Sequence, residues 1–230
     1  MEPDRGRSGG FPRRSVPRIW PGADRAAVEK FFDWAETPQE ADFALVRIES
    51  PLTDGGYTAR EGYIPISLQY RPYTAATARP GSIGQGDFRE TADPNRSYLG
   101  KTCYPANESD LDLVLNTRKA MQDKPVIVSV RMLNPCVLGE LEEAADAIIA
   151  DFGVQQDALL TVISGGAEPS GLLPVQLPRD METVEAHCED KPLDLEPYVD
   201  SQGNAYDFAF GLNWSGVICD DRTRRYPKDL

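Results

Sequence analysis

Glu49 and Glu61 are the two side chains whose type and position could best support chemistry in this sequence. Glu49 directly follows a short apolar run at 43–48, and Glu61 lies in the polar stretch beyond it, next to Gly62. A carboxyl group can serve as general acid, general base or nucleophile when it lies within reach of the reacting bond. Each glutamate could equally be an ordinary solvated carboxylate. Gly62 allows a ligand to approach closely, which favours Glu61 slightly and leaves Glu49 open.

The stretch from Tyr57 to Tyr104 that contains Glu61 is polar, aromatic and rich in glycine, with little periodicity. Its length is typical of an ordered functional loop rather than of a simple connection. Its tyrosines could contact a ligand through their rings, or could instead pack the loop onto the domain. The candidate binding residues in the loop are Tyr57, Tyr63, Gln69 and Arg71, with Tyr70 and Tyr73 nearby.

Alternating apolar strands and amphipathic helices must position these side chains. The continuous β-branched run at 125–130 predicts a strand covered on both faces, and the runs at 43–48 and 147–150 predict two neighbours. Helices are predicted at 24–35, 137–145 and 154–163, and from Asn107 to Met121 with Asn107 as the N-cap and Asp110 in the first turn. Residues 172–178, with Pro174 near the start and Pro178 at the end, predict an edge strand. This order predicts an α/β fold, a three-layer α/β/α sandwich with a mostly parallel sheet, over 24–230.

Ligands of such open sheets gather at the carboxyl ends of the strands, where both glutamates are expected. Residues 1–23, which mix Arg, Pro and Gly, predict a poorly structured segment.

The composition argues against several partners. A net charge of -13 and a pI near 4.6 repel nucleic acid and anionic membrane surfaces. No apolar run has the length of a membrane span, and the start lacks a signal-peptide pattern, so a cytoplasmic location is expected. Four scattered cysteines and one histidine, His187, argue against a zinc site. We therefore expect free or buried thiols, a surface position for His187, and no metal or cofactor.

An ordered set of motifs resembles the C-terminal domain of family 3 glycoside hydrolases of the β-glucosidase type. The set comprises Pro-Val-Ile-Val at 125–128, Ala-Asp-Ala-Ile at 145–148, Pro-Ser-Gly-Leu-Leu-Pro at 169–174, and Tyr-Asp-Phe-Ala-Phe-Gly-Leu at 206–212. Ala209 stands where the family usually has glycine. These motifs serve turns and strands, so they identify the family without forming its active site.

The resemblance implies hydrolysis of a β-linked glucoside or oligosaccharide with two carboxyl groups. One is a nucleophilic aspartate on a (β/α)8 barrel, for which this chain has no room. The other is an acid/base glutamate of this domain, and there are two candidates for it. Glu61 lies in a segment similar to the Gly-Glu-Gly-Tyr-Ile loop of some family members, and Glu49 ends a run similar to the Val-Gly-Glu strand end of others. For a sugar substrate, Tyr57 and Tyr63 could stack on the apolar faces of the rings, and Gln69 and Arg71 could bind the hydroxyl groups. Asp33-Trp34 superficially resembles the nucleophile motif, but it falls within the predicted helix at 24–35, where Trp34 is expected to pack.

Three hypotheses about function remain open at this point. The first is a β-glucosidase-like half that needs a separate barrel domain as its partner and is inactive alone. The second is a non-catalytic carbohydrate-binding or interaction module, and the third is an inactive truncated remnant.

Overall fold

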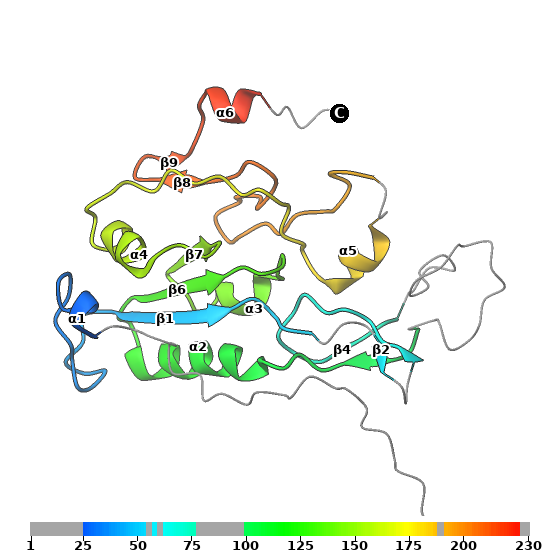
Figure 1. Ribbon diagram of the computed structural model, residues 1–230, viewed down its shortest axis with the longest axis horizontal. Helices are drawn as coiled ribbons and strands as arrows, with labels where there is room; N and C mark the ends of the chain where they lie inside the picture. The colour runs from blue at the N-terminus through cyan, green and yellow to red at the C-terminus, as the bar shows by residue number, and fades with distance from the viewer. Residues whose placement is uncertain (1–24, 54–56, 59–61, 77–98, 188–190, 226–230) are drawn as a thin grey trace, which may run out of the picture.

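The centre of the molecule is a parallel sheet of three strands in the order β1-β6-β7 (Figure 1). The computed structural model describes residues 25–53, 57–58, 62–76, 99–187 and 191–225. The strands are β1 (Ala44–Glu49), β6 (Val126–Arg131) and β7 (Ala147–Asp151), each within one residue of its predicted bounds. The predicted segment 1–23 lies outside the described residues.

The buried face of the sheet is built by the β-branched residues of the central strand. Val126, Val128 and Val130 are fully buried, and Val46 and Ile48 of β1 stand beside them in register. Helix α2 (Glu108–Met121) covers this face with Leu111, Val114 and Met121. Side chains on one face of a strand alternate with those on the other, so Arg47 and Glu49 of β1 point away from this core.

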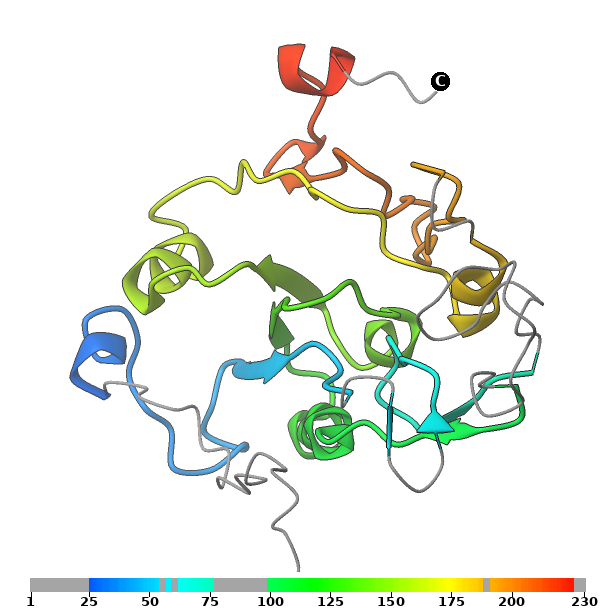
Figure 2. The same ribbon diagram turned by 45° about the vertical axis from the view of Figure 1, so that its right-hand side comes forward.

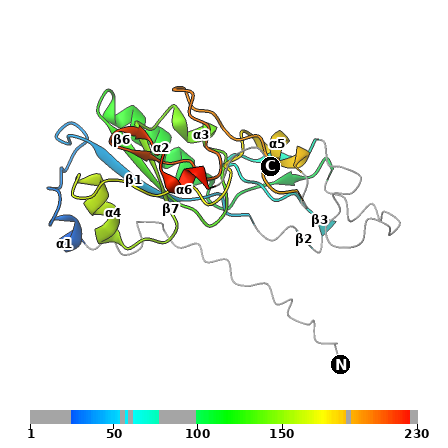
Figure 3. The ribbon, with the colours of Figure 1, turned by 90° about the horizontal axis from the view of Figure 1, so that it is seen from above.

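The other helices complete an α/β sandwich, as predicted. They are α1 (Arg25–Val28), α3 (Gly139–Glu142), α4 (Gln156–Ile163), α5 (Met181–Ala186) and α6 (Asp221–Arg224). In Figure 2, α2 and α3 lie on one side of the sheet and α1 and α4 on the other. Figure 3 shows α1 and α4 together at one end of the molecule.

Short antiparallel pairs lie outside the main sheet. They are β2 (Tyr57–Thr58) with β3 (Gly62–Tyr63), β4 (Tyr73–Thr74) with β5 (Thr102–Cys103), and β8 (Leu212–Asn213) with β9 (Gly216–Val217).

The helix predicted over 24–35 is wrong beyond its first turn. Helix α1 ends at Val28, and Phe32 packs edge-to-face on Phe43 with 5.2 Å between ring centroids. This contact brings the chain back toward the start of β1 and ends the helical path. Trp34 is 48% exposed rather than packed in the core, and the Arg25 guanidinium lies 5.7 Å from its ring centroid.

The edge strand predicted over 172–178 is also only partly realised. The Leu173 N–H donates to the Phe210 carbonyl, and the Ala209 N–H donates to the Leu173 carbonyl, but no regular strand is assigned there. Proline lacks the N–H that a ladder needs, so Pro174 interrupts the pairing, and Pro178 forms an isolated bridge with Pro197. These bonds nevertheless bring the 169–174 and 206–212 motifs side by side.

The described cysteines differ in burial. Cys103 and Cys136 are buried, and Cys219 is exposed. Burial raises the pKa of Cys136 to about 12, so this thiol stays protonated at neutral pH. Among the described residues, no helix is long and apolar enough to cross a membrane.

Candidate functional site

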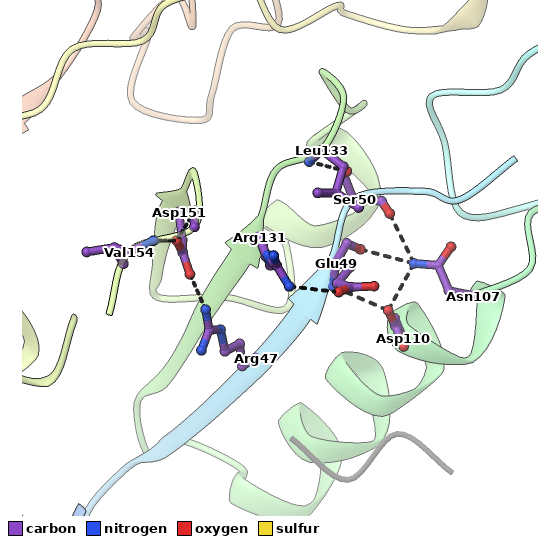
Figure 4. A network of polar contacts seen from close by, with 10 residues as sticks. Arg47, Glu49, Ser50, Asn107, Asp110, Arg131, Leu133, Asp151 and Val154 are labelled. Carbon is purple, nitrogen blue, oxygen red and sulfur yellow. Dashed lines mark hydrogen bonds and ion pairs between the residues drawn. The ribbon is translucent and has the colours of Figure 1, made fainter. Parts of the chain in front are cut away.

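Glu49 is the last residue of β1 and lies at the carboxyl edge of the sheet (Figure 4). Its side chain is 28% exposed, and one carboxylate oxygen lies 3.6 Å from Nη1 of Arg131. Arg131 is the register partner of Glu49 on β6 and is itself half-exposed. A partly exposed carboxylate at this edge can reach a ligand lying beyond the strand ends.

The backbone around Glu49 is held by buried side chains at the start of α2. Asn107, only 1% exposed, donates from Nδ2 to the carbonyls of Glu49 (3.1 Å) and Ser50 (3.2 Å), and its Oδ1 accepts from the Leu52 N–H (2.6 Å). Asp110 Oδ2 accepts from the Glu49 N–H at 3.3 Å and from Asn107 Nδ2 at 2.9 Å. We call these residues, Glu49, Ser50, Leu52, Asn107 and Asp110, the Asn107 network.

The side chain of Asn107 therefore has a different role from the predicted one. It occupies the N-cap position of α2 as predicted, but its side chain makes no capping bond to the helix. The strand end is buried against the helix start, and the carbonyls of Glu49 and Ser50 receive their hydrogen bonds from the Asn107 amide.

Two further contacts extend the Asn107 network on either side. The fully buried Tyr70 donates its hydroxyl to the Glu49 carbonyl at 2.8 Å. The Ser50 hydroxyl accepts the N–H groups of Leu133 and Asn134, which follow β6. These hydrogen bonds thus connect the loops that follow the adjacent strands β1 and β6.

A second ion pair crosses the sheet next to Glu49. Arg47 of β1 reaches over β6 to the carboxylate of Asp151 on β7, whose side chain is fully buried. Asp151 Oδ1 also accepts the N–H groups of Gly153 and Val154, both at 2.7 Å. Because all these groups are hydrogen-bonded, the pair orders the turn after β7.

Gln69 and Arg71, predicted to bind a ligand, are engaged within the protein. Arg71 pairs with Glu108 (2.8 Å) and Asp112 (2.7 Å) of α2, and their hydrogen bonds raise the pKa of Arg71. The Gln69 side-chain amide donates to the carbonyls of Arg71 and Pro72. In this arrangement both side chains stabilise their own loop.

Glu140 is a structural anchor of the same loop that the sequence analysis missed. Its carboxylate accepts the N–H groups of Tyr70 (2.5 Å) and Arg71 (3.1 Å). Burial raises the pKa of Glu140, and these two backbone hydrogen bonds oppose the shift. A glutamate in the first turn of a short helix gives no sequence signal for such a distant contact.

The other two predicted binding residues lie on the β2–β3 pair. Tyr57 and Tyr63 are register partners there, and Glu61 directly precedes β3 in sequence but lies outside the described residues. The structure thus brings Glu49 and the 69–71 segment together through Tyr70 and α2. Tyr70 itself packs the loop onto the domain.

His187 is not simply a surface residue. Its ring is half-buried, and Nδ1 contacts the Asp194 carboxylate. Within the described ranges, no group of three or more His, Cys, Asp or Glu side chains is arranged to hold a metal ion.

Comparison with known proteins identifies the family of this chain. The model of the glycosyl hydrolase family 3 C-terminal domain matches residues 29–214. Beta-glucosidase C of Emericella nidulans is 39% identical over 193 residues, which cover 78% of this chain and 30% of that protein. Probable beta-glucosidase C of Aspergillus flavus is 31% identical and covers 78% of this chain. The periplasmic beta-glucosidase/beta-xylosidase of Dickeya chrysanthemi is 25% identical and covers 88%.

The chain spans less than a third of the length of these relatives: 30%, 21% and 25%, respectively. No solved structure matches it. The family match extends from the residue after α1 to the tip of the β8–β9 hairpin, and so includes the sheet, α2 and the Asn107 network. The chain belongs to the glycosyl hydrolase family 3 C-terminal domain family.

Proposed function

We propose that this chain supplies the acid/base carboxyl group, and part of the sugar-binding surface, for the hydrolysis of terminal β-glucosides. The observation that supports the proposal is the location of Glu49, a partly exposed carboxylate at the carboxyl end of β1, in a chain whose relatives are named β-glucosidases. Retaining hydrolysis needs two carboxyl groups about 5 Å apart. The nucleophile comes from a barrel domain that these 230 residues do not contain.

Glu49 and Glu61 are the two candidates for the acid/base residue. Glu49 has a defined position, and its carboxylate must leave Arg131 to protonate a leaving oxygen. Glu61 precedes β3 and belongs to the loop that also carries the candidate binding residues Tyr57 and Tyr63. Each candidate makes a separate prediction, because only the true acid is needed for substrates with poor leaving groups.

Without a nucleophile, the chain has negligible glucosidase activity. A general acid contributes about 10²–10⁴-fold to a rate, which is far short of what glycoside hydrolysis requires.

The test is an assay with aryl β-glucosides, using the chain alone and mixed with the separately expressed barrel domain of the Emericella nidulans relative. We expect turnover only in the mixture. Glu49→Gln or Glu61→Gln should then lower the rate by about 10²–10⁴-fold for phenols of high pKa and spare very acidic phenols. Glu40→Gln, an exposed glutamate ahead of β1, is the matched control and should not change the rate.

Two results would contradict the proposal. Activity of the chain alone that disappears on mutating one of its own carboxylates would mean that it carries a complete site. A mixture that binds sugar but shows no turnover would favour a carbohydrate-binding module instead.

A further inference from the structure

We infer that Asn107 is a positioning residue: it fixes the backbone from Glu49 to Leu52 and thereby sets where the Glu49 carboxyl lies at the edge of the sheet. The effect on the backbone stands by itself. Only the effect on turnover rests on the function proposed above.

The first argument is that Asn107 connects both ends of this segment through opposite ends of one amide. Nδ2 donates to the Glu49 and Ser50 carbonyls, and Oδ1 accepts the Leu52 N–H. An amide is the side-chain group that can donate and accept in this way from a fixed plane. Aspartate has the same shape but cannot donate when ionised.

The second argument is burial. Asn107 is 1% exposed and Ser50 is fully buried, so water cannot readily replace a lost partner. Buried carbonyls without donors are costly, and a segment that loses them relaxes toward solvent. The side chain of Glu49 would move with its own backbone.

The third argument is that, among the contacts that the structure describes, Tyr70 duplicates one of the Asn107 hydrogen bonds but not the other two to this segment. Tyr70 also donates to the Glu49 carbonyl, but Asn107 provides the side-chain bonds to the Ser50 carbonyl and the Leu52 N–H that the structure describes. The neighbouring charges are Asp110 on the same helix, and Glu49 with its partner Arg131 from the sheet. Nδ2 lies against Asp110, so replacing it with a carboxylate oxygen would set two negative charges together.

The test uses two variants that separate positioning from charge. Asn107→Asp removes the donor and adds a charge beside Asp110. The double variant Asn107→Asp/Asp110→Asn removes the same donor from position 107 but keeps the net charge and avoids that repulsion. The double variant also keeps the inference testable if Asn107→Asp does not fold.

The control is Asn204→Asp. The Asn204 Nδ2 donates to Asp200 Oδ2 at 2.9 Å, so this variant makes the same chemical change next to a carboxylate, in a turn far along the chain from β1.

The first readout is amide hydrogen exchange of Ser50, Leu133 and Asn134, compared with the unchanged protein under the same conditions. Ser50 donates to the Arg131 carbonyl, and the other two donate to the Ser50 hydroxyl. We expect exchange to be about 10- to 100-fold faster in the double variant, and unchanged in Asn204→Asp. Unchanged protection in the double variant would overturn the inference.

The second readout is turnover in the mixture with the barrel domain. We expect the double variant to lower kcat by about tenfold or more for poor leaving groups with KM little changed, because a misplaced acid acts on the transition state. A rise in KM alone, or an equal loss for acidic phenols, would overturn the link to Glu49. If the unchanged mixture shows no turnover, the proposed function fails while the exchange measurement still decides the role of Asn107.

Discussion

The segment after β1 and the closing motifs of the chain are held in place by opposite means. Buried side chains hold the first: Asn107, Asp110 and Tyr70 all bond to the backbone of Glu49. The closing motifs at 169–174 and 206–212 are held by direct backbone contact, with the Leu173 N–H 2.7 Å from the Phe210 carbonyl.

The two closing motifs approach each other closely at two glycines. A Cβ added at Gly211 would lie 2.2 Å from the Gly171 carbonyl oxygen. The comparison therefore indicates that the β1 segment is sensitive to losing side-chain atoms, while the closing motifs are sensitive to gaining them.

The largest expected effect is that of Asn107→Ala. It leaves the buried Ser50 carbonyl and the partly buried Leu52 N–H without this partner, and should lower the free energy of unfolding by about 3 kcal/mol in a urea titration. The control is Asn116→Ala, an exposed position on the same helix, with an expected change within about 0.5 kcal/mol. Similar losses of stability at both positions would show that the segment after β1 is not especially sensitive to losing side-chain atoms.

Gly211→Ala tests the other half of the comparison. The added methyl group meets a backbone oxygen that cannot move by a rotamer change, so we expect a loss of about 2 kcal/mol in the same titration. Gly171→Ala is the matched control, because nothing lies within 4 Å of its added Cβ. A tolerated Gly211→Ala would mean that the two motifs can separate at little cost.

Glu140→Gln should have a smaller effect that depends on pH. Burial raises the pKa of Glu140 above its ordinary value of 4.5, so the protonated side chain favours the folded state. This contribution is complete below about pH 4.5 and is lost as the pH rises through the folded-state pKa. The variant lacks this dependence. Its deficit, about 1–2 kcal/mol from the weakened bonds to Tyr70 and Arg71, should be largest at low pH and shrink as the pH rises.

The control for this measurement is Glu143→Gln at the end of α3, which should not change the pH dependence. A Glu140→Gln deficit that grows toward neutral pH would show that the ionised carboxylate is the form that folding prefers.

The smallest effect is a gain from Ala209→Gly. Ala209 has a φ of 63°, in the left-handed region that alanine adopts at a cost of about 1–2 kcal/mol. Glycine removes this strain, but its greater freedom in the unfolded chain offsets part of the effect. We therefore expect the free energy of unfolding to rise by about 0.5–1 kcal/mol. The same exchange at Ala158, exposed in α4, should instead lower stability by about 0.5–1 kcal/mol. A loss at Ala209 would show that the left-handed conformation is not the strained feature of the closing motif.

Much of the fold could be predicted because its signals are local. The β-branched run that became β6 is a strand by composition and length, and the alternation with amphipathic helices sets the layers. The sequence also showed that Ala209 stands where the family usually has glycine, and the positive φ of this residue explains why glycine suits the position. The helix over 24–35 failed because the contact between Phe32 and Phe43 outweighed the helical spacing.

The candidate site was predictable only in part. The sequence by itself determined the residue types at the carboxyl end of β1, and that Glu49 would lie there. Tertiary structure alone decided that Asn107 bonds to a strand end instead of capping its helix, that Arg71 pairs with α2, and that Glu140 anchors the next loop. The partners in these contacts lie far apart in the chain, and a hydrogen bond depends on distance and angle that only the docking of α2 and α3 beside the sheet sets.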